Sequence, residues 1–196
     1  MAKILPGKNS TQKEMIAKGA ATLFKTKGFK ATSMRAIAEV VGVEAPSLYN
    51  HIGSKTELLQ LICFKVAKKF TAHLSDIENA SGPVAEKIES IIRFHIQMML
   101  ENFDEVFVAN HEWKHLEDTT LTNFLHQRQS YEKRLVTLIE KGINKKELRK
   151  QNAYAVVLTI LSAVRGLEFW QRHKKNISAQ VLEDTMVDHL LNGIIM

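Results

Sequence analysis

Cysteine and proline are scarce in this 196-residue chain, which contains one cysteine, three prolines and nine glycines. The single cysteine, Cys63, excludes an intrachain disulfide and a zinc site built from several thiolates. Few prolines and glycines, and no run of alternating β-branched residues, leave almost no room for a sheet. We therefore predict an all-α fold.

Long apolar runs are also missing. The most apolar segment, AVVLTILSAV at residues 155–164, is well short of the ~20 residues needed to cross a bilayer. The N-terminus has no basic stretch followed by an apolar core, the pattern of a secretion signal. We expect no membrane span and a cytoplasmic protein.

Helical signals are present along most of the chain. Apolar residues recur at helical spacing between capping residues and glycines. The expected helices run from about Thr11 to Gly28, Thr32 or Ser33 to Val41, Glu44 or Ala45 to Tyr49 or Asn50, Ser54 to Ile77, Val84 to Asn102, Asp104 to His115, Thr119 or Thr120 to Gly142, Asn152 to His173, and from Ser178 onward. This pattern predicts about nine helices.

Positive charge is concentrated near the N-terminus. Residues 1–52 contain eight Lys and Arg against three Asp and Glu, a balance of +5, whereas residues 53–196 contain 19 against 18. Nearly all of the net charge of +6 therefore lies in the first quarter of the chain. A basic face of this kind attracts phosphate backbones, although any single lysine also serves solubility.

The segment from Thr32 to Lys55 carries the most specific pattern. Thr32 or Ser33 is suited to cap a helix, and Gly42 is suited to the left-handed conformation that ends it. Pro46 is tolerated in the first turn of the next helix, because its missing N–H has no intrahelical partner there. Two short helices joined by a glycine turn are typical of a helix-turn-helix DNA reader.

The run IAEVVGVEAPSLYNHIGSKTELL at residues 37–59 resembles the DNA-binding region of TetR/AcrR-type transcriptional regulators, whose pattern is roughly IA-xx-AGV-xxx-(T/S)LY-x-HF-x-SK-xx-L. Two residues depart from it: Glu44 replaces a small polar cap and Ile52 replaces an aromatic. The resemblance implies a helix-turn-helix domain at residues 1–53 and an all-helical ligand-binding and dimerisation domain at 54–196. It implies no catalytic residue, cofactor or metal.

The resemblance also assigns the DNA contacts. The expected phosphate contacts are Thr32, Ser33, Tyr49, His51 and Lys55, and the expected base contacts are Ala45, Pro46, Ser47 and Asn50. Asparagine pairs well with adenine, and small apolar groups fit a thymine methyl. Tyr49 can also pack against the first helix, and His51 can cap its own helix end.

Small side chains follow one stripe of the helix expected after Asn152. They permit close approach of a partner helix, although packing within the monomer explains the spacing equally well. A dimer is favoured because one reader contacts few base pairs and two readers reach a palindromic operator. The expected dimer residues, on the last two helices, are Ala155, Thr159, Ala163, Gly166, Met186 and Leu190.

The segment HEWKH at residues 111–115 matches the H-E-x-x-H pattern of zinc hydrolases. There His111 and His115 are ligands and Glu112 is a general base. No third histidine or Met-turn follows. We keep a zinc hydrolase as an alternative, beside a regulatory metal site and ordinary helix-surface histidines.

Aromatic, methionine and charged residues on the expected inner faces suggest an effector pocket. The candidate pocket residues are Phe94, Met98, Phe103, Phe107, His111, Trp113, Phe124, Arg128, Tyr131, Leu161 and Arg165. Most such stripes are core, and Arg128 and Arg165 can equally form internal salt bridges. If they face a cavity, an anionic and largely apolar effector fits, such as an acyl or acyl-CoA-like molecule.

We interpret the chain as a homodimeric repressor that binds double-stranded operator DNA and is released by a small-molecule effector of unknown identity. When the effector changes the distance between the two recognition helices, only one of them can bind its half-site fully. The binding equilibrium then shifts toward free DNA. The zinc hydrolase and a helical small-molecule carrier are the alternatives. DNA binding that weakens steeply with salt distinguishes the repressor from both.

Overall fold

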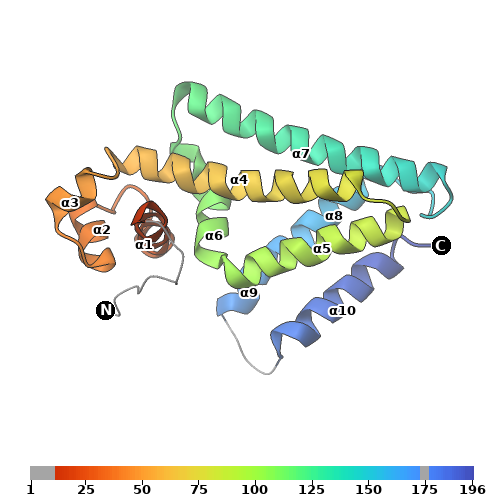
Figure 1. The fold of residues 1–196 in the computed structure, drawn as a ribbon. Coiled ribbons are helices and arrows are strands. Elements are labelled where there is room, and N and C mark those ends of the chain that lie inside the picture. Colours follow the sequence, from red (N-terminus) through yellow and green to blue (C-terminus); the bar gives the residue numbers. More distant parts are fainter. Residues whose placement is uncertain (1–11, 173–176) are drawn as a thin grey trace. The chain divides into compact units, whose positions relative to one another are not determined.

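The computed structural model describes residues 12–172 and 177–196, and these residues form helices without a strand. The helices are α1 (Gln12–Lys27), α2 (Met34–Val41), α3 (Ala45–Tyr49), α4 (Lys55–Asn79), α5 (Val84–Glu101), α6 (Phe103–His111), the short 3-10 helix η1 (Trp113–His115), α7 (Asp118–Asn144), α8 (Ala153–Arg165), α9 (Leu167–Arg172) and α10 (Ala179–Asn192) (Figure 1). The all-α prediction is confirmed, with α8 and α9 together corresponding to one of the nine expected helices.

Two of the expected helices are interrupted. The helix expected after Asn152 is divided at Gly166, which is the C-cap of α8 and precedes α9; its expected end near His173 lies outside the described residues. Glycine has the weakest helix propensity after proline, so a break there is inexpensive. The helix expected over 104–115 ends at His111, and Glu112 leads into η1.

The described residues divide into two compact units. The N-terminal unit comprises the residues up to Ala67 together with Asp104–Leu125, and the C-terminal unit comprises Lys68–Phe103 together with the residues from His126 onward. Both α4 and α7 contribute their N-terminal part to the N-terminal unit and the remainder to the C-terminal unit.

The N-terminal unit has a fully buried apolar core. In it α1 contacts α2, and α2 contacts α3. The largest side chains of this core, all at most 1% exposed, are Ile16, Phe24, Ile37, Leu48, Ile52, Leu58, Leu59 and Ile62. Ile52, which replaces the aromatic of the TetR pattern, is part of this core, so the substitution keeps its apolar role.

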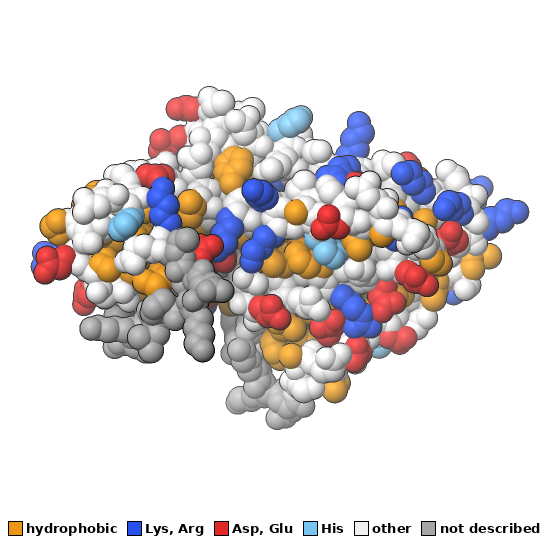
Figure 2. Space-filling model, in the orientation of Figure 1, with side chains coloured by type: hydrophobic (Ala, Val, Ile, Leu, Met, Phe, Trp, Pro, Cys, Tyr) orange, Lys and Arg blue, Asp and Glu red, His pale blue; other side chains and the backbone are white. Residues whose placement is uncertain are grey.

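In the C-terminal unit α5 contacts α8, α9 and α10. Its fully buried residues include Leu74, Ile92, Ile96 and Leu148. On the face shown in Figure 2, acidic side chains outnumber basic ones over α5 and α10, although residues 53–196 as a whole are nearly balanced in charge.

The stretch Ala153–Gln171 is long and apolar enough to cross a membrane by length and composition, with a mean hydropathy of 1.4 and 33% of that window buried. This differs from the expectation based on residues 155–164, because the apolar stretch includes α9 as well as α8. A helix of a protein core or of an oligomer interface passes the same test.

Candidate nucleic-acid interface

The turn between α2 and α3 depends on Gly42. Its backbone is left-handed, with φ 79° and ψ 30°, a conformation that costs little only without a Cβ. The Gly42 N–H donates to the Ala38 carbonyl at 2.9 Å, and the Val43 N–H donates to the same carbonyl at 3.0 Å. Together with a longer bond of 3.3 Å from the Gly42 N–H to the Glu39 carbonyl, these bonds cap the C-terminal end of α2 where the chain reverses, so the glycine-turn prediction is confirmed.

α3 is a short helix with one buried and one exposed side. Leu48 is 0% exposed and anchors the helix in the core of the N-terminal unit. The expected base contacts Pro46, Ser47 and Asn50 are exposed, and Ala45 is half-buried. Glu44 is the N-cap residue but makes no side-chain capping bond. The outward side of α3 is thus accessible to a partner as large as a DNA duplex.

Two of the expected phosphate contacts flank α3 at its C-terminal end. Tyr49 is 54% exposed, which is unusual for a large aromatic and leaves its phenol accessible. His51 is also exposed. Neither side chain is part of the core, so both are accessible to phosphate. Their phosphate contacts stay predictions.

The two residues before α2 have different surroundings. Ser33 is exposed and caps α2, accepting a hydrogen bond from the Ala36 N–H at 3.1 Å. Thr32 is 3% exposed, and its hydroxyl donates to the Gly28 carbonyl at 2.8 Å. The Thr32 side chain therefore supports the loop internally, and its phosphate contact stays a prediction.

Lys55 begins α4 and holds the loop before α2. Its Nζ donates to the carbonyls of Phe29 at 2.8 Å, Lys30 at 3.2 Å and Thr32 at 2.9 Å. These bonds use the three donors of an ammonium group. A phosphate contact by Lys55, which stays a prediction, would have to replace one of them.

The start of α4 is held by a capping box, for which a serine followed three residues later by a glutamate is the sequence signature. Ser54 accepts a hydrogen bond from the Glu57 N–H at 3.0 Å, and the Glu57 carboxylate accepts one from the Gly53 N–H at 2.7 Å. This reciprocal capping places Lys55 in the first turn of α4. Exposed Lys27, Lys30 and Arg35 add positive charge to the same unit.

The HEWKH segment is part of the N-terminal unit but not of one continuous helix. His111 is the last residue of α6, and His115 is the last residue of η1. Glu112 accepts a hydrogen bond from the Phe29 N–H at 3.2 Å, and His115 Nε2 lies 3.4 Å from its carboxylate. Within the described ranges, no three His, Cys, Asp or Glu side chains form a metal-binding group.

The candidate pocket residues are divided between the units. Phe107, His111, Trp113 and Phe124 belong to the N-terminal unit, whereas Phe94, Met98, Phe103, Arg128, Tyr131, Leu161 and Arg165 belong to the C-terminal unit. Met98 and Phe124 are buried, and Arg165 is exposed at the last turn of α8. The pocket assignment stays a prediction.

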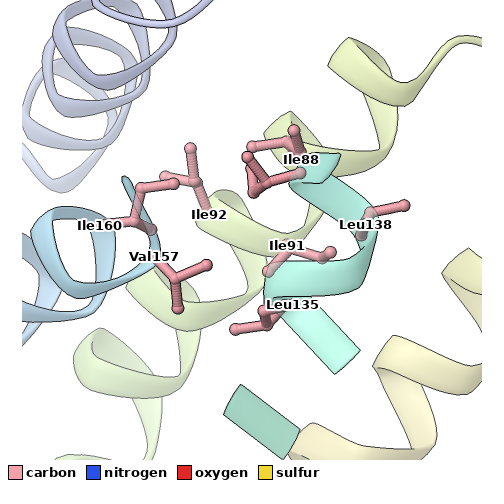
Figure 3. A pocket seen from close by; sticks show the side chains of 8 residues that line it. Ile88, Ile91, Ile92, Leu135, Leu138, Val157 and Ile160 are labelled. Carbon is pink, nitrogen blue, oxygen red and sulfur yellow. The ribbon is translucent and has the colours of Figure 1, made fainter. Parts of the chain in front are cut away.

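The C-terminal unit contains an apolar cavity that the candidate pocket residues do not line. Figure 3 shows Ile88, Ile91 and Ile92 of α5 meeting Leu135 and Leu138 of α7 and Val157 and Ile160 of α8. The cavity volume is about 20 Å³, room for about one water. Small-molecule sites measure ~300 to 1,000 Å³, so α5, α7 and α8 must separate before an effector can enter here.

A half-buried polar cluster lies one helical turn from this cavity along both α5 and α7. His95 Nε2 is 2.7 Å from the Tyr131 hydroxyl, and the His95 ring stacks on Phe70 at a centroid distance of 4.4 Å. Burial lowers the pKa of His95 to about 3, and neighbouring His73 adds to the effect. Burial also raises the pKa of the Tyr131 phenol well above its usual value. Both groups are neutral at physiological pH.

All the expected dimer residues except Gly166 line one or both of two surface hollows of the C-terminal unit. Ala163, Met186 and Leu190 line an almost wholly apolar one of about 280 Å³. Ala155, Thr159 and Leu190 line a second of about 220 Å³. Nearby on α8, Tyr154 and Leu158 are 59% and 54% exposed. Exposed apolar groups of this size are typical of an interaction face.

Family models match both parts of the chain. Residues 16–62 match the model described as bacterial regulatory proteins, tetR family. Residues 81–194, more than half of the chain, match the model described as tetracyclin repressor-like, C-terminal domain. The chain therefore belongs to the tetR family of bacterial regulatory proteins, and its N-terminal helix-turn-helix is a DNA-binding module of a transcriptional regulator.

Curated relatives and solved structures agree. The HTH-type transcriptional repressor KstR2 of Mycobacterium tuberculosis is 21% identical over 188 residues, which cover 95% of this chain and 94% of the relative. KstR2 of Mycolicibacterium smegmatis is 24% identical, covering 73% of this chain and 70% of the relative. The structure of the ketosteroid transcriptional regulator KstR2 of M. tuberculosis matches with a TM-score of 0.87 at 20% identity, covering 98% and 100% of the two chains.

A second solved structure, AibR in complex with isovaleryl coenzyme A and operator DNA, matches with a TM-score of 0.80 at 23% identity and covers 92% of this chain and 98% of that one. These structural likenesses show that the whole TetR fold is present. The hydrolase and carrier alternatives receive no support from the relatives.

Proposed function

We propose that this protein is a homodimeric transcriptional repressor that binds a palindromic operator and leaves it when a small apolar or acyl-type effector binds. The observation that supports this proposal most directly is the exposed side of α3. Buried Leu48 anchors the opposite side of this helix, in a segment that matches the tetR family model. KstR2 is a repressor by its name, and AibR was solved with an acyl-coenzyme A and operator DNA. A cytoplasmic protein without enzymatic activity follows from this role.

The DNA contacts divide into two groups. Ser47, Asn50, Pro46 and Ala45 on the outward side of α3 read base edges, and exposed Tyr49, His51 and Ser33 contact phosphates. Phosphate contacts fix the register of the protein, and base contacts select the sequence. Thr32 and Lys55 contribute by stabilising the loop before α2, since their polar atoms already bind backbone carbonyls.

A second copy of the chain covers the exposed face of α8 and α10. This explains why Ala153–Gln171 is so apolar although only 33% of its window is buried in one chain. It also brings two readers to half-sites about 34 to 36 Å apart, or a multiple of that distance. Without the second copy, Tyr154 and Leu158 would remain in water at a cost in solubility.

The effector acts on the C-terminal unit. In the present state its cavity is nearly closed, so this structure corresponds to the effector-free form in the proposal. An effector that binds only the opened form shifts the population toward that form. A difference of a few kcal/mol in binding free energy between the two forms suffices.

Selection of binding sites from random duplexes with the purified protein tests the proposal. We expect a palindromic site, and an affinity that falls by several orders of magnitude between about 50 and 200 mM salt for six to ten phosphate contacts. Screening acyl-coenzyme A thioesters and free fatty acids for release from the selected duplex then tests the effector class. A folded protein that shifts no duplex at low salt would refute the proposal.

Substitutions on α3 test the division of contacts. Tyr49→Ala is expected to weaken binding similarly on all duplexes, whereas Asn50→Ala and Ser47→Ala should relax the preference at particular base pairs. Each base preference should correspond to about 1 to 3 kcal/mol. A uniform loss on every duplex for all three variants contradicts the division.

A further inference from the structure

The HEWKH segment has no part in the proposed function, yet two of its side chains contact one residue of the α1–α2 loop, residues 28–33. Glu112 accepts a hydrogen bond from the Phe29 N–H at 3.2 Å. The His115 ring stacks on the Phe29 ring, with centroids 5.3 Å apart and planes inclined by 19°. All three residues lie in the N-terminal unit. The end of α6 and η1 therefore hold the α1–α2 loop through Phe29.

The same residue is contacted from the start of α4. Lys55 Nζ lies 4.5 Å from the centroid of the Phe29 ring and donates to the Phe29 carbonyl at 2.8 Å. Phe24 meets the ring edge-on at 5.2 Å. Phe29 is thus contacted through its N–H, its carbonyl and its ring by three separate helical segments.

Chemistry explains why a glutamate and a histidine suit this place. A carboxylate forms a charge-assisted bond to an amide, roughly twice as strong as a neutral one. His115 Nε2, 3.4 Å from the Glu112 carboxylate, orients that carboxylate while its ring packs on Phe29. Both side chains are largely buried, at 20% and 13% exposure for His115 and Glu112.

We propose that Glu112 and His115 are positioning residues for operator binding, which hold Phe29 so that the α1–α2 loop presents the N-terminus of α2 to DNA. Ser33, the N-cap of α2, ends this loop, and Lys55 binds the Thr32 carbonyl just before it. A loop released at Phe29 moves the first amides of α2 relative to α3. This inference rests on the proposed function.

Operator affinity of the full-length protein provides the test. We expect Glu112→Ala, which loses the charge-assisted bond to the Phe29 N–H, and His115→Ala, which loses the ring stacked on Phe29, each to weaken binding to the selected duplex by about tenfold. Glu112→Gln keeps a neutral acceptor and His115→Phe keeps a stacked ring, so each should bind more tightly than the matching alanine variant and lose no more than about threefold relative to the wild type. The exposed Glu117→Ala is the control for the loss of one negative charge.

The salt dependence separates positioning from direct contact. Because no phosphate-neutralising cation is removed, Glu112→Ala should keep the slope of log affinity against log salt unchanged. Amide exchange without DNA gives an independent result: the Phe29 amide and the first amides of α2 should exchange faster in Glu112→Ala than in Glu117→Ala.

Three results would overturn the inference: wild-type affinity for folded Glu112→Ala, a Glu112→Gln variant as weak as Glu112→Ala, or stoichiometric zinc bound by the wild type and lost in both alanine variants. Folding is checked by circular dichroism for each variant, and if the alanine variants unfold, Glu112→Gln and His115→Phe with amide exchange still decide the question. A wild type that binds no duplex refutes the proposed function instead, and the exchange result at Phe29 remains valid.

Discussion

The helix-turn-helix and the C-terminal unit are held together at different ranges along the chain. In the helix-turn-helix, the contacts that define α2, the turn and the start of α4 join residues three to five apart, such as Ser33 with Ala36 and Val43 with Ala38. In the C-terminal unit, Arg93 pairs with Glu183, 90 residues away, and His95 pairs with Tyr131, 36 residues away. The structure of a region built from local contacts can be predicted from its sequence, whereas the structure of a region built from distant pairs cannot.

The two regions also treat polar groups differently. The reader keeps its titratable groups at the surface, with Tyr49 and His51 exposed. The C-terminal unit holds half-buried His95 and Tyr131 as a neutral pair among aromatic rings. Buried polar groups must be paired, so this pair constrains how the C-terminal unit packs, whereas the exposed groups of the reader remain available to DNA.

The largest expected effect follows from removing the anchor of α3. Leu48→Ala deletes a side chain that is 0% exposed, and it should lower the free energy of unfolding by about 2 to 5 kcal/mol. Operator affinity should fall as well, because α3 is no longer anchored in the core of the N-terminal unit. Chemical denaturation and a binding titration measure the two effects. If Leu48→Ala matched the effect of truncating exposed Tyr49, α3 would not be anchored as described.

Acid should act mainly on the C-terminal unit. His95 has a pKa of about 3 in the folded protein and about 6.5 in the unfolded chain. Between these values the unfolded state binds the extra proton, so stability is full above about pH 6.5 and falls as the pH falls, by about 2 kcal/mol at pH 5. Denaturation at pH 7.5 and pH 5 measures this.

His95→Gln removes the titration while keeping a hydrogen-bonding group for Tyr131, so its stability should depend less on pH. The exposed His126→Gln should behave like the wild type. Equal pH dependence in His95→Gln and the wild type would show that His95 is not the responsible group.

The glycine turn should be more sensitive than a glycine in the other region. Gly42→Ala places a Cβ at φ 79° and should cost about 1 to 2 kcal/mol. Gly193 has φ −72° and room for a Cβ, with the nearest atoms at 3.7 Å. Gly193→Ala should therefore be nearly neutral in thermal denaturation. A larger loss at Gly193 than at Gly42 would reverse the comparison.

The smallest expected effects concern helix caps. Ser54→Ala in the reader and Ser178→Ala at the start of α10 each remove one capping acceptor, and each should cost about 1 kcal/mol. The two losses should be equal within error, because capping is local wherever it occurs. A loss at one site several times that at the other would show a tertiary role for that serine.

Several elements could be predicted because their determinants are close in sequence. The turn at Gly42, the cap at Ser33, the capping box of Ser54 and Glu57, and the outward side of α3 all agree with the structure. The buried position of Thr32 and the binding of Lys55 to three carbonyls could not be predicted, because both depend on where the end of α1 lies. The cavity likewise depends on three helices meeting.

The HEWKH segment shows the same difference between what local sequence indicates and what distant contacts decide. Its residues alone suggested two histidines on one helical face, but the helix ends at His111 and Glu112 takes a hydrogen bond from Phe29, 83 residues earlier. No periodicity in the chain signals that partner.

The amino-acid sequence by itself determined the helical class, the caps, the glycine turn and the basic character of the reader, because propensity, capping and charge act within a turn or two of the chain. Tertiary structure alone decided that Glu112, after the end of α6, accepts the Phe29 N–H, that His95 is neutral beside Tyr131, and that the apolar cavity is nearly closed. These features arise from packing between segments dozens of residues apart, where burial and pairing, rather than local preference, set the energy.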